Sequence, residues 1–144
     1  MFDCNQDITI WNRWKDPLNK QADEVFYRHV IPVKCKFKNS VVKTAGDSGV
    51  IFGNAITIII PYTVFYVPYE VWIMISEDER RNLFTFNLND LVALGVKDAE
   101  INSSPNGIKE SEIKSMYSPN ACHIKSVKDN THSKHGKHYK LEGA

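Results

Sequence analysis

The sequence lacks the motifs by which most enzyme classes are recognised. Its 144 residues contain no G-x-S-x-G, no G-x-x-x-x-G-K-[ST] and no H-E-x-x-H, and no glycine-rich loop leads from a strand pattern into a helix pattern. These patterns mark nucleophilic, phosphate-binding and zinc-dependent sites. We therefore expect a protein that is not an enzyme and that binds no cofactor.

The sequence also has few cysteines and almost no net charge. Cys4, Cys35 and Cys122 are far apart and form no C-x-x-C pair, so we expect three free thiols in a reducing compartment. Lys and Arg (18) nearly balance Asp and Glu (17), which gives a formal net charge of +1. This balance excludes an overall electrostatic attraction to nucleic acid or anionic lipid, although a local attraction stays open.

Neither a secretory signal nor a membrane span is expected. The opening M-F-D-C-N-Q-D-I-T-I-W has no basic start and no continuous apolar core. Residues 55–75 are apolar over the length of a bilayer span, but Pro61, Pro68 and Glu70 interrupt them. Their β-branched and aromatic residues predict strands separated by a proline turn. We expect no membrane contact and a protein made in the cytoplasm.

Several short segments alternate apolar and polar residues with period 2, the pattern of half-buried β-strands. The predicted strands cover residues 7–11, 25–31, 33–38, 55–60, 90–95, 122–127 and 137–141. One helix is predicted over residues 108–117, and the glycines of residues 42–54 predict a flexible loop or β-turn region. We expect one mainly β domain over residues 1–144, a small barrel or sandwich with long loops, one short helix and a loop-rich apolar insertion at about 62–82.

Histidines gather near the end of the sequence, where His132, His135 and His138 follow His123 with the spacing H-x2-H-x2-H. Residues three apart share a helix face but not a strand face, and the sequence here is typical of a hairpin. Interleaved lysines would also repel a divalent cation. We predict a polar connection and no metal site.

Two surfaces are candidates for contact with other proteins. The apolar insertion begins with more aromatic residues than a core of this size requires, and aromatic enrichment without charge is typical of a subunit interface. The candidate interface residues there are Tyr62, Phe65, Tyr66, Tyr69 and Trp72. The second surface is basic: residues 123–140 carry five lysines and one acid, and Lys134 and Lys137 lie in the polar connection. Protein, DNA or solvent could face these lysines.

With the strands placed, the order of motifs resembles the small stopper, or head-completion, proteins of the head–tail connectors of tailed bacteriophages that infect Gram-positive bacteria. The resemblance rests on D-I-T-I-W-N-R, V-F-Y-R-H-V-I-P-V, the Ser/Gly-rich loop before A-I-T-I-I-I-P, D-L-V-A-L-G, and the closing I-K-S-V-K-D-N and H-S-K-H-G-K-H-Y-K-L-E-G. Residues 62–82 have no counterpart in that pattern.

The resemblance implies a β-barrel that assembles with itself into a ring, expected to be a hexamer, in the neck of the virion. Its partners would be the portal or adaptor ring and the tail terminator or tail tube, with non-specific contact to packaged DNA as an open alternative. The lumen-directed loop would contain Gly46, Asp47, Ser48, Gly49 and Gly53. Two other functions stay open: a tail terminator or adaptor of the same neck, and a small single-stranded nucleic-acid-binding barrel.

Overall fold

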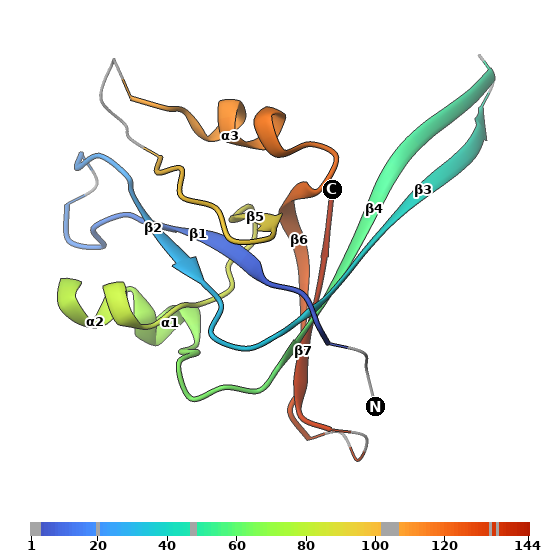
Figure 1. The fold of residues 1–144 in the computed structure, drawn as a ribbon. Coiled ribbons are helices and arrows are strands. Elements are labelled where there is room, and N and C mark those ends of the chain that lie inside the picture. Colours follow the sequence, from blue (N-terminus) through green and yellow to red (C-terminus); the bar gives the residue numbers. More distant parts are fainter. Residues whose placement is uncertain (1–3, 20, 47–48, 102–106, 133, 135) are drawn as a thin grey trace.

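The chain folds around one antiparallel β-sheet, which a computed structural model describes over residues 4–19, 21–46, 49–101, 107–132, 134 and 136–144, with the backbone alone for 41–46 and 49–54. Within these residues, seven strands lie in the order β2-β1-β5-β6-β7-β4-β3 (Figure 1). The strands are β1 (Ile8–Trp14), β2 (Val25–Val30), β3 (Lys36–Gly46), β4 (Gly49–Pro61), β5 (Leu91–Leu94), β6 (Ala121–Asn130) and β7 (His138–Gly143). The predicted mainly β fold is confirmed.

Strand β6 joins two halves of this sheet. Its first residues pair with β5, whereas residues from Ile124 onward pair with β7, and a register irregularity lies between Ile124 and Ser126. Buried side chains of both halves form one core cluster, with Ile10 from β1, Ile58 from β4 and Leu141 from β7 among its members. The two halves therefore share a core, as the layers of a sandwich do.

Strands β2 and β3 end the sheet, so the described ladder does not close into a barrel. The two half-sheets instead meet at a seam between Gln6 and Cys35. The Gln6 N–H donates to the Cys35 carbonyl at 3.0 Å, and the Cys35 N–H donates to the Gln6 carbonyl at 2.7 Å. The Gln6 side-chain oxygen accepts a third bond from the Phe37 N–H at 2.9 Å. One residue pair and one side chain thus connect the half-sheets on this side.

Residues 42–46 and 49–54, predicted to lie in a flexible loop or β-turn region, are instead strand. The β3–β4 register runs from Lys36 opposite Ile59 to Gly46 opposite Gly49 without a break. The sequence prediction was wrong because it gave three glycines more weight than the β-branched and aromatic residues between them, which favour strands. We call residues 41–54 the arm; Figure 1 shows that the end of this hairpin extends away from the other strands.

The arm contains the candidate channel residues. Gly46 and Gly49 are opposite each other at its tip, and Gly53 lies within β4, opposite Val42. Asp47 and Ser48 lie outside the described residues. Three of the five predicted loop residues are therefore part of a paired hairpin.

The apolar insertion holds two of three short helices found in the described chain. They are α1 (Tyr69–Trp72), α2 (Glu77–Asn82) and α3 (Glu110–Tyr117), and only α3 was predicted. The strand expected beyond the proline turn is absent from this segment, because Pro68 precedes α1. Ser76 begins α2 by accepting a hydrogen bond from the Glu79 N–H. No helix in the described ranges is long and apolar enough to cross a bilayer.

Gly143 lies at the point where β7 is opposite both β4 and β6. A Cβ atom there would lie 2.5 Å from Cys122 Sγ and 2.6 Å from the His123 carbonyl oxygen. We expect Gly143→Ala to lower the free energy of unfolding by about 1–3 kcal/mol, the usual cost of overpacking. Urea denaturation measures this loss, with the exposed neighbour substitution Glu142→Ala as control. An unchanged midpoint for Gly143→Ala would contradict the close approach.

Candidate functional site

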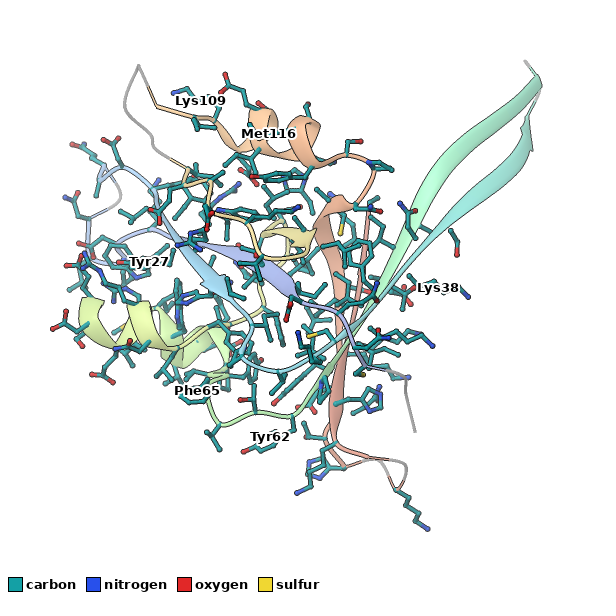
Figure 2. All side chains as sticks on the ribbon, viewed as in Figure 1. Tyr27, Lys38, Tyr62, Phe65, Lys109 and Met116 are labelled. Carbon is teal, nitrogen blue, oxygen red and sulfur yellow. The ribbon has the colours of Figure 1, made fainter. Side chains whose placement is uncertain are left out.

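The predicted interface residues differ in how far they reach the surface. Tyr62 and Phe65 are 49% and 47% exposed, whereas Trp72 is fully buried. Figure 2 labels Tyr62 and Phe65 on the connection between β4 and α1. The prediction that Trp72 is a surface anchor is wrong, since its indole is enclosed within its own chain.

Trp72 belongs to a buried cluster that holds α1 and α2 against β2. Its Nε1–H donates to the Leu83 carbonyl at 2.8 Å, and its ring meets Tyr27 edge to face at 5.5 Å between centroids. Arg80 of α2 is also buried, with its guanidinium 4.0 Å from the Trp14 ring centroid. This arginine donates to the Tyr27 hydroxyl at 3.3 Å and to the Ile75 carbonyl. The aromatic rings and hydrogen bonds together compensate for burial of the cation.

Tyr66 and Tyr69 are half-buried and are weaker candidates for a surface contact. The Tyr66 ring lies 4.8 Å from Phe86 and 4.4 Å from Tyr139, measured between ring centroids. Burial raises the pKa values of both Tyr66 and Tyr69. Tyr66 thus serves the core. Exposed apolar area in this segment comes instead from Tyr62 and Phe65 and from three residues without an aromatic ring: Val64, Val71 and Met74.

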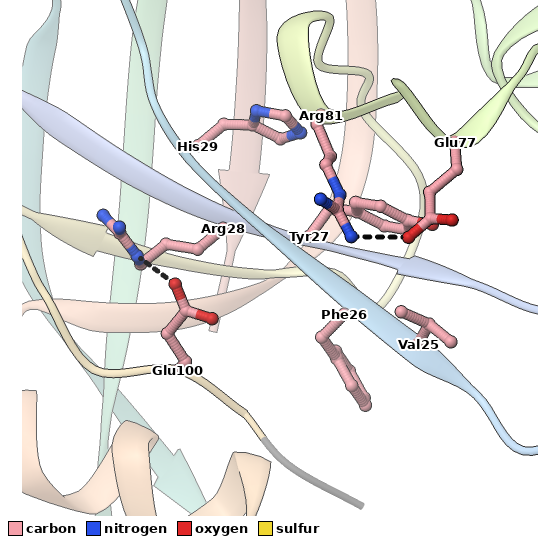
Figure 3. Close-up of a pocket in the computed structure, with 8 residues that line it drawn as sticks. All are labelled: Val25, Phe26, Tyr27, Arg28, His29, Glu77, Arg81 and Glu100. Carbon is pink, nitrogen blue, oxygen red and sulfur yellow. Dashed lines mark hydrogen bonds and ion pairs between the residues drawn. The ribbon is translucent and has the colours of Figure 1, made fainter. Parts of the chain in front are cut away.

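A groove follows the outer edge of β2, and Figure 3 shows the residues that line one part of it. Two adjoining cavities of about 440 and 360 Å³ share Arg28, His29 and Arg81 as lining residues. Five consecutive residues of β2 line the first cavity, and its remaining lining residues are Glu77, Arg81 and Glu100. The second cavity continues past Pro32 to Phe65 and Phe84. The groove therefore connects the edge of the sheet with the exposed apolar segment.

The charged side chains of the β2 groove already have partners. Arg28 Nε lies 3.2 Å from Glu100 Oε1, and Arg28 Nη1 donates to the Lys97 carbonyl at 3.0 Å. Arg81 Nη2 lies 2.6 Å from Glu77 Oε1, one turn away on α2 (Figure 3). These pairs are exposed enough to exchange partners at small cost.

His29 is the buried polar residue of this groove. Burial lowers its pKa to about 4, so the imidazole is neutral at pH 7. Among the described residues, its buried Nε2 has no hydrogen-bond partner. An unpaired buried nitrogen is costly, which marks this point of the groove as incomplete in the isolated chain.

A second buried polar group, Asp90, lies at the start of β5. Its carboxylate accepts hydrogen bonds from Asn12 Nδ2 at 3.0 Å and from the Arg13 N–H at 3.2 Å. Burial nevertheless raises the pKa of Asp90 to about 7, because these donors only partly offset the loss of water. Asp90 therefore titrates near neutral pH.

The basic hairpin β6–β7 lies beside the apolar segment. The Tyr62 N–H donates to the Lys137 carbonyl at 3.0 Å, and Lys137 Nζ is 6.0 Å from the Tyr62 ring centroid. Lys134 and Lys137 are both exposed. The structure thus brings Tyr62 together with one of the two predicted lysines, although they come from distant parts of the sequence.

In the described ranges the two buried thiols are protonated, and no cluster of metal ligands is found. Cys4, Cys35 and Cys122 take part in no disulfide bond. Burial raises the pKa of Cys35 to about 12 and that of Cys122 to about 11, so both stay protonated. No group of three or more His, Cys, Asp or Glu residues is placed to hold a metal ion in the part of the chain that the structure describes, which does not include His135.

The β2 groove was missed by the sequence analysis. One of its walls could have been found: Ser76 and Glu79 form the S-x-x-E pattern that begins many helices, and they do so at α2. The edge position of β2 could not have been predicted from the sequence, because it depends on which strands pair. Sequence alternation gives the faces of a strand but not its neighbours.

Comparison with known proteins gives one family. Residues 3–144 match the family described as Family of unknown function (DUF6751). No curated protein and no solved structure matches the chain.

Proposed function

This chain belongs to that family of unknown function, and we propose that it is a non-enzymatic structural protein of a tailed-bacteriophage neck. In this role it forms a ring, expected to be a hexamer, that closes the DNA channel and docks the tail. Its neighbours would be the portal or adaptor ring on one side and the tail terminator or tail tube on the other. The motif resemblance of residues 124–143 is the starting point for this proposal.

The single observation that carries the proposal is the arm, which extends from a small β body (Figure 1). An isolated two-stranded ribbon is only marginally stable in water, so a long one is best explained by contacts made in an assembly. In a ring of identical copies, each arm would extend past its own subunit toward an adjoining copy, the axis or a neighbouring ring. A channel can be narrowed in this way by geometry alone.

Charge and surface also favour an assembly role. A net charge of +1 suits a channel that must release DNA, since a strongly basic wall would retain phosphates. The exposed residues Tyr62 and Phe65 provide aromatic area for an adjoining protein. Lys137 beside Tyr62, together with the exposed Lys134 of the same hairpin, can contact an acidic surface of that protein.

One rival function has an observation of its own. The β6–β7 hairpin exposes Lys125, Lys128, Lys134 and Lys137, which also suits a single-stranded nucleic-acid-binding protein. That rival predicts tight oligonucleotide binding that weakens steeply as salt is raised. A neck protein should bind oligonucleotides only weakly.

Native mass spectrometry of the purified chain tests the proposal. We expect a closed oligomer, with six copies of the 16.5 kDa chain giving about 99 kDa. Adding a fluorescent single-stranded oligonucleotide in the same buffer gives the matched control for the rival function. A chain that stays monomeric up to millimolar concentration and binds the oligonucleotide tightly would contradict the neck assignment.

A further inference from the structure

The outer edge of β2 offers backbone groups for pairing. The Ile31 N–H donates to the Ile8 carbonyl at 2.9 Å, and Val30 lies opposite Thr9 in the β1–β2 register. In an antiparallel pair, hydrogen-bonded and non-hydrogen-bonded positions alternate. Phe26, Arg28 and Val30 therefore direct their N–H and carbonyl groups away from β1. No other described strand pairs with that edge.

The β2 groove lies along this edge. Successive side chains of a strand point to opposite faces, so a cavity lined by five consecutive residues must lie beside the backbone. Glu77 and Arg81 of α2 form one wall, and Glu100 stands on the opposite side of the strand (Figure 3). The unpaired Nε2 of His29 lies in the same lining. A slot of this form accepts an extended segment that hydrogen-bonds to the edge strand.

We propose that the β2 groove binds the β3 edge of the arm of a second copy of this chain, which adds to the sheet as a strand. This inference rests on the proposed ring and names the joint between its subunits. Each copy would then offer its arm to one neighbour and its groove to the other.

Three properties of β3 fit it to the groove. It is the strand at the opposite end of the sheet, and its outer edge is unpaired among the described strands. The part of β3 that lies in the arm carries one lysine, Lys43, and no acid. The groove carries one glutamate on each side, Glu77 and Glu100, and each is paired with an arginine of the groove. A lysine can join these glutamates by exchange of an exposed ion pair, at small cost. A joint between two unlike edges is heterologous, and such joints close into rings when the rotation allows.

A proline in the edge tests the joint. Val30→Pro removes an N–H that points away from β1, and edge strands tolerate proline at such positions. Val30→Ala is the matched control, because it shortens the same side chain and keeps the N–H. Sedimentation equilibrium should show association about tenfold weaker for Val30→Pro than for Val30→Ala, the usual effect of one lost backbone hydrogen bond. Equal association of the two variants, with both folded by circular dichroism, would overturn the proposal.

Amide hydrogen exchange on the unmodified chain keeps the test independent of any folding defect. The N–H groups of Phe26, Arg28 and Val30 should exchange fast at low concentration and become protected on assembly. An oligomer in which these three amides stay unprotected would overturn the groove as the joint and leave the ring intact.

A shortened arm separates this inference from the proposed function. Replacing residues 43–52 by Asn-Gly joins Val42 to Gly53 through a two-residue turn. The shortened protein should be monomeric, and a cyclised peptide of residues 41–54 should bind it and protect the same three amides. Peptide binding by a chain that never forms a ring would contradict the neck assignment alone. No binding and an unchanged oligomer for the shortened chain would contradict the joint alone.

Discussion

Trp72→Ala is expected to lower the free energy of unfolding by about 3–5 kcal/mol, the usual cost of truncating a buried large aromatic residue. The substitution leaves a cavity between α1 and β2, and it leaves the Leu83 carbonyl without its indole donor. It also removes the edge contact with Tyr27, whose hydroxyl accepts a bond from the buried Arg80. Chemical denaturation followed by circular dichroism measures the loss.

Phe65→Ala is the matched control in the same segment. About half of this ring is already exposed, so we expect a loss of about 1 kcal/mol or less and weaker assembly. The two variants should therefore separate a core role from an interface role. A normally stable Trp72→Ala protein that fails to assemble would reverse the two assignments.

Acid should have two opposing effects on stability, and single substitutions should separate them. Burial raises the pKa of Asp90 in the folded protein from its ordinary value of 3.8 to about 7, so the folded state binds the proton more tightly. Its contribution to stability grows as the pH falls from about 7 toward 3.8. The slope is about 1.4 kcal/mol per pH unit inside that window.

His29 acts in the other direction. Burial lowers its pKa in the folded protein from the ordinary value of 6.5 to about 4, so the unfolded chain binds the proton more tightly. Its contribution to stability is complete above pH 6.5 and is lost as the pH falls toward 4, with a similar slope. Between about pH 6.5 and 4 the two groups therefore nearly cancel.

Urea denaturation from pH 8 to 5 tests this balance. The wild-type free energy of unfolding should change little below pH 6.5, whereas Asp90→Asn should lose stability and His29→Gln should gain it as the pH falls over the same range. Both variants start from a lower stability, because each disturbs a buried hydrogen-bonding site. Parallel pH profiles for the three proteins would show that neither group titrates in this window.

The strands that the sequence predicted best show either alternation with one buried face or a short apolar run between a polar residue and a glycine. Residues 90–95 and 137–141 are close to β5 and β7, and Cys35 and Phe37 are buried as their spacing predicted. Here local pattern and tertiary packing favour the same structure. The short helix α3 was found for the same reason, through helical spacing that ends before a proline.

The sequence was misleading where burial depends on distant partners. Thr9, the polar residue between Ile8 and Ile10 in an alternating segment, is buried, and its hydroxyl donates to the Gly95 carbonyl at 2.8 Å. Arg80 lies in a run of charges that suggests a solvated turn, and its burial depends on aromatic rings from β1 and β2. Composition of a short segment cannot reveal a partner 50 or more residues away. The candidate site was missed for this reason more than for lack of motifs.

The position of β7 between β6 and β4 affects how the chain can fold during translation. This strand is synthesised after the other six, yet both β4 and the second part of β6 pair with it. While earlier residues leave the ribosome, the β3–β4 hairpin and the β1–β2–β5 strands can form only as separate units. The exposed edge of β4 must then wait for residues 138–143, which makes nascent chains the form of this protein most prone to aggregation.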